Sequence, residues 1–219
     1  MFTFCSLRLL RQDKLMNLFS KFRFSSKKWN STTLKNTQNK YSKSDKPDRF
    51  YYYNVDTRGR LYLSDVYPKN MTTSLKDKKF LDFFYKNMRI NNTGISPETR
   101  YVSICANEYN FIFPDDNKSA LVFTDFINKN TNAIDQNYFL NDSLIFASGL
   151  LQPFDPKELF YDSVNQRLYH KITNHKNLKG ELGLFHPFIA VNICDHIDFD
   201  SFNTCYLTWN QEKYKIANI

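Results

Sequence analysis

The chain has 219 residues, 42% hydrophobic and 17% aromatic, which is enough to bury one sizeable core. Only 5 Gly and 7 Pro are present, which excludes a collagen-like or low-complexity protein. The formal charge is +8, but residues 1–46 contain 11 Lys/Arg and 2 Asp/Glu. Residues 47–219 therefore carry 19 basic and 20 acidic residues, a net charge of −1. This balance disfavours nucleic acid as a partner of the folded part.

Residues 1–48 are rich in Arg, Lys, Ser and Thr and poor in acids, which is typical of a mitochondrial transit peptide. On a helical wheel Arg11, Lys14 and Lys21 lie within about 80° of one another, although Leu18 interrupts this face. A disordered basic tail is the alternative. No stretch reaches the ~18 apolar residues of a transmembrane helix. We expect a leader and flexible linker over 1–48, a single domain over 49–219, and residence in the mitochondrial matrix.

The stretch 50–65 predicts a β-hairpin. Hydrophobic and polar residues alternate on both sides of the turn Asp56-Thr57-Arg58-Gly59. Asp suits the first position of a type I turn, and Gly59 can adopt the left-handed conformation that closes such a loop.

The stretch 74–90 predicts the principal amphipathic helix. Ser74 can cap it, with Asp77 three residues later in a near capping-box arrangement. Its apolar stripe comprises Phe80, Leu81, Phe84 and Met88. The opposite face is basic, which suits either an acidic partner or plain solvation.

The remaining sequence is rich in short strands. Expected strands are 101–105, 109–113, 120–123, 138–140, 144–146, 167–170, a long alternating stretch 184–200, 205–209 and 214–216. A short helix should start at Asp155-Pro156. Arg60-Leu61-Tyr62 recurs as Arg167-Leu168-Tyr169, which is compatible with a duplicated hairpin or with chance. We predict an α+β fold: a mainly antiparallel sheet built from hairpins, with the 74–90 helix packed on it.

Motifs for nucleotide, acyl-transfer or zinc-protease chemistry are absent from the sequence, which has no GxGxxG, GxxxxGK[ST], GxSxG or HExxH. The four cysteines form no CxxC pair and are expected to be reduced thiols. If 184–200 were one strand, Cys194, His196, Asp198 and Asp200 would share a face, but only two of them could reach one ion. We interpret this face as polar and outward, and expect neither a metal nor a cofactor.

Cys105 is the best nucleophile candidate, but a catalytic thiol needs a base or a positive neighbour, and Glu108 would raise its pKa. Glu108 and Asn110 at the hairpin end can recognise a ligand or satisfy their own turn. The candidate binding residues, all near turns or the start of the helix, are Asp56, Gly59, Lys76, Asp77, Cys105, Glu108 and Asn110.

The run YYYNVDTRGRLYLSDVYPKNMTTSLKDKKFLDFFYKNMR at 51–89 resembles an uncharacterised eukaryotic protein family, number 0598. The likeness continues through Cys105, Glu108, Asn110 and Phe111, then VFTDF at 122–126 and RLYH at 167–170, and fades toward the C-terminus. The family pattern has Gly-Arg where this chain has Ala106-Asn107, which argues against a phosphate or carboxylate site in this loop. The resemblance implies mitochondrial residence and no assigned activity.

Two functions remain as hypotheses. The first is a non-catalytic binding or assembly factor with protein partners in mitochondria, since every catalytic motif tested is missing. The alternative is an enzyme of unfamiliar type that uses Cys105, Glu108 or a histidine. An enzyme should bring one of these residues to a histidine in a deep pocket. A binding module should show a shallow groove or an exposed apolar patch, with the polar groups satisfied locally. The sequence leaves the oligomeric state open.

Overall fold

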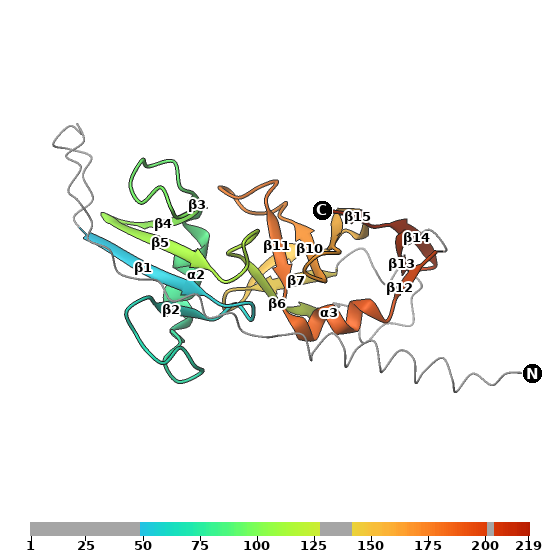
Figure 1. The fold of residues 1–219 in the computed structure, drawn as a ribbon, viewed down its shortest axis with the longest axis horizontal. Helices are drawn as coiled ribbons and strands as arrows, with labels where there is room; N and C mark the ends of the chain where they lie inside the picture. The colour runs from blue at the N-terminus through green and yellow to red at the C-terminus, as the bar shows by residue number, and fades with distance from the viewer. Residues whose placement is uncertain (1–48, 128–141, 201–203) are drawn as a thin grey trace, which may run out of the picture. The chain divides into compact units, whose positions relative to one another are not determined.

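The computed structural model describes residues 49–127, 142–200 and 204–219. These residues form three β-sheets and two α-helices, which confirms the α+β class (Figure 1). Two of the three sheets are mixed, because they contain three parallel strand pairs, whereas the β12-β13-β14 sheet is antiparallel. The prediction of a mainly antiparallel sheet built from hairpins is therefore confirmed only in part, because these three pairs are neither antiparallel nor hairpins. The reason is that strands far apart in sequence lie side by side: β1 pairs with β5, β6 with β11, and β9 with β15.

The first sheet has five strands in the order β2-β1-β5-β4-β3. Their bounds are β1 Arg49–Val55, β2 Leu61–Leu63, β3 Met88–Ile90, β4 Tyr101–Cys105 and β5 Glu108–Pro114. Both hairpins predicted here, β1–β2 and β4–β5, are confirmed. The expected turn between β1 and β2 forms, with the amide of Gly59 donating to the carbonyl of Asp56 at 2.9 Å.

Helix α2 (Lys78–Lys86) is shorter than predicted at both ends. Asp77, not Ser74, caps it, and its carboxylate accepts from the amide of Phe80 at 2.7 Å. The preceding chain cannot be helical, because the amide of Leu75 donates to the carbonyl of Leu61 beside β2. At the other end the helix stops at Asn87, and Met88 pairs with β4. The apolar stripe is nevertheless real, since Phe84 packs on the sheet against Tyr53.

The second sheet has seven strands in the order β15-β9-β10-β11-β6-β7-β8. Their bounds are β6 Val122–Ile127, β7 Ser143–Phe146, β8 Leu150–Pro153, β9 Leu159–Asp162, β10 Arg167–Lys171, β11 Leu182–Phe185 and β15 Ala217–Asn218. The helix start at Asp155-Pro156 yields one 3-10 turn, Pro156–Glu158. The strand predicted over 120–123 starts later and runs on to Ile127. The strand predicted over 138–140 lies outside the described residues.

The long strand predicted over 184–200 was wrong. This stretch contains the end of β11, helix α3 (Pro187–Cys194) and strand β12 (Ile197–Phe199). Pro187 occupies the first turn, and the His186 ring accepts from the amide of Phe188 at 3.1 Å. A proline behind a capping side chain starts a helix, and this local signal outweighs the alternation. Strand β12 joins β13 (Cys205–Trp209) and β14 (Glu212–Lys215), the expected closing hairpin.

The β1–β2 turn contacts the second sheet. A Cβ at Gly59 would lie 3.0 Å from Cγ2 of Thr124 on β6. One hydrophobic core spans both sheets and includes Tyr53 and Phe84 as well as Leu144 and Tyr169. Among the described residues, no helix has the length and apolarity needed to cross a bilayer.

Candidate functional site

A wide, open groove of about 770 Å³ runs between helix α2 and the β4–β5 turn. We call it the α2 groove. Its lining residues come from the start of β1, the α2 helix and the turn: Arg49, Phe80, Phe83, Cys105, Ala106, Asn107 and Glu108. Phe83 is 52% exposed although it is a large apolar side chain. Arg49 and Glu108 form a loose, exposed ion pair at 3.8 Å. The groove therefore offers aromatic surface with one charge of each sign.

Two of the predicted binding residues, Cys105 and Glu108, meet in this groove because they face each other across the β4–β5 hairpin. Cys105 is a buried residue, and its Sγ lies 3.4 Å from Oγ of Ser103. Burial raises the pKa of the Cys105 thiol, Glu108 adds to the rise, and the hydrogen bond with Ser103 opposes it. None of the described residues that line the groove is a histidine. The positive charge of Arg89 lowers the pKa of the thiol, but burial and Glu108 outweigh it, so the net shift disfavours the thiolate that a nucleophile needs.

Asp77 and Asn110, two further predicted binding residues, serve local structure, whereas Lys76 is simply exposed. Asp77 caps α2, as described above, and Lys76 is an exposed side chain one residue earlier. Asn110 is buried and its Nδ2 donates to the carbonyl of Ser103 at 3.0 Å, which ties β5 to β4. The structure thus brings Cys105 and Glu108 together in a groove, whereas Asn110 holds strand β5 to strand β4.

Asp56 and Gly59 hold the β1–β2 turn. The Asp56 carboxylate accepts from the amides of Arg58 and Arg60, both at 2.9 Å. Oδ2 of Asp56 also accepts from Nε of Arg60 at 2.6 Å and from the hydroxyl of Tyr62 at 3.3 Å. Gly59 has a φ of +76°, which is the left-handed conformation expected for it. These hydrogen bonds stabilise the turn, and they use both oxygens of the Asp56 carboxylate.

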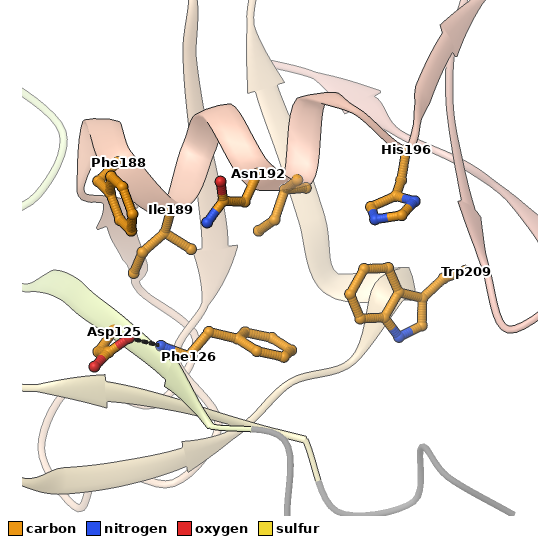
Figure 2. Close-up of a pocket in the computed structure, with 8 residues that line it drawn as sticks. Asp125, Phe126, Phe188, Ile189, Asn192, His196 and Trp209 are labelled. Carbon is orange, nitrogen blue, oxygen red and sulfur yellow. Dashed lines mark hydrogen bonds between the residues drawn. The ribbon is translucent and has the colours of Figure 1, made fainter. Parts of the chain in front are cut away.

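A second hollow, of about 210 Å³, lies between helix α3 and strands β6 and β13 (Figure 2). We call it the α3 pocket. Its lining comprises aliphatic and aromatic side chains with a polar rim: Asp125, Phe126, Phe188, Ile189, Asn192, Ile193, His196 and Trp209. Figure 2 shows the Trp209 and His196 rings close together, and their centroids are 5.5 Å apart. None of these residues was a predicted binding residue.

Histidines 170 and 175 belong to the interior. The ring of His170 is fully buried, and its Nε2 lies 3.0 Å from the amide of Asp155 and 3.0 Å from the carbonyl of the same residue. His175 lies 2.8 Å from the carbonyl of Tyr85 through Nε2. Burial lowers the pKa of both imidazoles, which favours their neutral form. Their ring nitrogens are used in hydrogen bonds that hold the fold.

Residues 194–200 do not form a shared metal-binding face. Cys194 ends helix α3, His196 lies in the following loop, and Asp198 is in β12. In the described part of the chain no group of three or more His, Cys, Asp or Glu side chains could hold a metal ion.

Sequence reasoning missed two buried carboxylates. Asp116 accepts from Nη1 of Arg167 at 2.5 Å and from the hydroxyl of Tyr169 at 2.8 Å. Asp142 is 3% exposed, and neither of its oxygens accepts a hydrogen bond of normal geometry from a described residue. Burial raises the pKa of Asp142 to about 6, which the Trp209 indole partly opposes. The repeated Arg-Leu-Tyr triplet could have pointed to Asp116, because Arg167 and Tyr169 both bind it. No sequence pattern pointed to Asp142.

Most of the chain matches the model of one protein family. A model described as a domain of unknown function, DUF4505, matches residues 38–219. The chain belongs to the DUF4505 family. Both the α2 groove and the α3 pocket lie within the DUF4505 match. The match begins eleven residues before Arg49, the first residue that the structure describes.

A solved structure is also similar to the DUF4505 chain. It is a DUF1285 family protein from Silicibacter pomeroyi DSS-3, with 11% sequence identity and a TM-score of 0.47. The similarity covers 82% of this chain and 91% of the other.

Proposed function

We propose that this chain is a non-catalytic binding or assembly factor of mitochondria, and that the α2 groove receives a segment of a partner protein. The observation that carries the proposal is the combination of a half-exposed Phe83 with an open groove that lacks a histidine. Exposed aromatic side chains in a groove are typical of sites that anchor protein partners.

The polar groups of the groove suit recognition. Arg49 and Glu108 are held only loosely to each other, so a partner can replace that ion pair with better contacts. The backbone of Ala106 has a φ of +52°, which fixes the tight turn between β4 and β5. The rim of the groove is therefore formed by the paired β4–β5 hairpin.

The alternative is an enzyme centred on Cys105. The raised pKa of that thiol, and the lack of a histidine among the described residues that line the groove, speak against it. Replacing Cys105 with Ser should therefore leave partner binding intact, whereas a catalytic thiol would make that variant inactive in any cellular assay.

Mitochondrial residence rests on the composition of the leader. We propose that residues 1–48 direct import and that residues 49–219 are the folded domain. A reporter fused to residues 1–48 should enter the matrix; a cytosolic reporter would remove this part of the proposal. The family match starts at residue 38, so reporters should be fused both to residues 1–37 and to residues 1–48.

We also propose that the finer family assignment is to the uncharacterised family 0598. The tyrosine-rich strand, the Asp56–Gly59 turn and the RLYH stretch at 167–170 support it. Members of the two families should share this pattern over their whole domains when aligned, and a mismatch in the turn and the RLYH stretch would separate them.

The experiment that tests partner binding is photo-crosslinking in isolated mitochondria. A photoreactive residue in place of Lys79, an exposed position on α2 close to Phe83 in sequence, should capture a defined protein. Phe83→Glu should abolish capture. Val164→Glu is the matched control, because Val164 is 86% exposed and lies in a turn of the second sheet. Equal loss with both variants, or no capture by the parent chain, would refute the proposal.

A further inference from the structure

Helix α2 presents different chemistry on the two sides of Phe83. At about 100° per residue, Phe80 lies about 60° from Phe83 on one side, and both rings line the α2 groove. Lys79 and Lys86 lie about 40° and 60° from Phe83 on the other side. Both lysines are exposed. The half-exposed ring of Phe83 therefore lies between an aromatic groove and a pair of cations.

The two lysines are not neutralised within the described part of the chain. Neither Lys79 nor Lys86 forms an ion pair with a described residue. The two acids of this segment are engaged elsewhere. Asp77 caps the helix, and Oδ1 of Asp82 accepts from the amide and the hydroxyl of Ser148 at 3.2 and 2.8 Å. Positive potential consequently remains along the outer side of α2.

The opposite border of the groove adds one more cation and one carboxylate. Arg49 and Glu108, both in the lining, form the loose ion pair at 3.8 Å. With Lys79 and Lys86, three cations and one carboxylate border the aromatic surface. A ligand with several carboxylates is therefore the complementary one.

The spacing lets one extended segment use the rings and the lysines together. Side chains three or four residues apart on a helix have Cβ atoms about 5–6 Å apart, which is the relation of Phe83 to Lys79 and Lys86. An extended segment advances about 3.3 Å per residue. An acid one or two residues from an apolar anchor can therefore reach a lysine while the anchor contacts Phe83.

Two other occupants fit less well. Residues 1–46 contain 11 Lys/Arg and 2 Asp/Glu, so the leader has the same sign of charge as the border of the groove. A lipid bilayer is a broad surface, whereas the Phe80 ring lies in a groove between a helix and a hairpin turn. A narrow chain segment can reach that ring.

We propose that the segment received by the α2 groove is acidic, with one large apolar side chain between Asp or Glu residues. The apolar side chain would pack on Phe80 and Phe83, and the neighbouring carboxylates would pair with Lys79 and Lys86. This assignment rests on the proposed binding function and names the chemistry of its partner.

Arrays of short peptides with a central Phe test the charge preference. The positions beside the Phe are Asp in one set, Ser in the second and Lys in the third, and the outer positions vary. The labelled full-length chain should bind the Asp set about fivefold more tightly than the Ser set, because an exposed ion pair is worth up to about this factor. The Lys set should bind least. Phe83→Ala should remove this signal, whereas binding to the basic leader is common to all variants.

Charge reversal supplies the decisive comparison. A Lys79→Glu/Lys86→Glu chain should prefer the Lys set. The matched control is Lys213→Glu/Lys215→Glu, which changes the net charge equally at two exposed positions of β14 outside the groove lining and should keep the preference for Asp. Binding that needs Phe83 but shows no preference for Asp, or a preference that survives the reversal at Lys79 and Lys86, would overturn the acidic assignment and leave the groove proposal standing.

The outcomes of this test and of photo-crosslinking are separable. Absence of a Phe83-dependent signal from the Asp set would overturn the acidic assignment whatever is captured in mitochondria. A Phe83-dependent Asp signal without any capture would overturn only the mitochondrial partner. A photoreactive residue at position 79 keeps Lys86, so capture is weakened rather than lost.

Other anionic surfaces are tested with the same variants. The probes are phosphatidylcholine vesicles with and without phosphatidylglycerol, and an oligouridine RNA. If either anionic probe bound through Phe83, Lys79 and Lys86 while the Asp peptides did not, the partner would be a membrane or a nucleic acid and the acidic assignment would be wrong.

Discussion

The hydroxyl of Tyr169 donates a 2.8 Å hydrogen bond to Oδ1 of Asp116, which precedes it by 53 residues. Arg167, on the same face of strand β10, binds the same oxygen. The first sheet repeats this pattern: Arg60 and Tyr62 both bind Oδ2 of Asp56. Each Arg-Leu-Tyr triplet follows the turn of an antiparallel hairpin, β1–β2 or β9–β10. Residues two apart on a strand face the same way, so Arg and Tyr converge on one carboxylate.

The two triplets should differ in their contribution to stability. Tyr169→Phe removes a short bond inside a buried network and should reduce the free energy of unfolding by about 1–2 kcal/mol. Tyr62→Phe removes a 3.3 Å bond in a local turn and should cost less than about 0.5 kcal/mol. Urea unfolding of both variants measures the difference. Equal losses would show that the hydrogen bonds at Asp116 stabilise the fold no more than those at Asp56.

Substitutions at Gly59 and Gly180 should distinguish the cost of backbone strain from the cost of steric contact. Gly59 and Gly180 both have positive φ, but only at Gly59 would a Cβ meet neighbours, at 3.0 Å from Thr124 and 3.1 Å from Val122. Gly180→Ala should cost about 1 kcal/mol through its φ alone. Gly59→Ala should cost about 1–3 kcal/mol more, because two packed β-branched side chains must move. Thermal unfolding compares them; a larger loss at Gly180 would contradict the contact between the turn and β6.

Asp142 should make stability depend on pH. Its folded pKa is raised to about 6 from an ordinary value of 3.8, so the native state holds the proton more tightly than the unfolded chain. The native state therefore gains stability as pH falls from about 6 to 4, and loses it as pH rises through 6. Asp142→Asn should be more stable than the parent at pH 7, by up to about 3 kcal/mol. The difference should vanish near pH 4.

Melting temperatures of the two proteins between pH 4 and 7.5 provide the measurement. His170 and His175 act in the opposite direction, because their pKa values are lowered, and protonating them below about pH 6.5 costs stability. They are common to both proteins and cancel in the difference. An Asp142→Asn variant that is less stable than the parent at pH 7, with the gap closing toward pH 4, would mean that Asp142 is paired in the native state.

The cysteines should differ in reactivity. Burial raises the pKa of all three thiols in the described residues, for Cys194 and Cys205 to about 11, so access to the reagent decides the order. Cys194 is an exposed residue, whereas Cys105 and Cys205 are buried. A thiol reagent at pH 7.5 should modify Cys194 first in a Cys5→Ser chain, with Cys105 at least about tenfold slower. Mass spectrometry of peptides after timed quenching gives the rates. Fast modification of Cys105 would revive the nucleophile hypothesis.

The sequence alone determined the features that depend on neighbouring residues. The turn Asp56–Gly59, the β4–β5 hairpin and the apolar stripe of α2 follow from alternation, turn chemistry and helical spacing, all of which act within a few residues. The composition of the leader and the near-neutral charge of residues 47–219 can also be read from the sequence without knowledge of the fold. Cys105 and Glu108 could be paired from sequence because a two-residue turn joins them.

Only the tertiary structure decided what depends on distant partners. The parallel pairing of β1 with β5 joins segments about fifty residues apart, and no local pattern encodes it. Leu75 was lost from the helix because it bonds to β2. The α3 pocket needs side chains from β6, α3 and β13 at once, and Trp209 and Asp125 have no sequence signal that relates them. Packing energy is collective, so which apolar residues meet, and which hollow they leave, is fixed by the whole core rather than by any stretch of it.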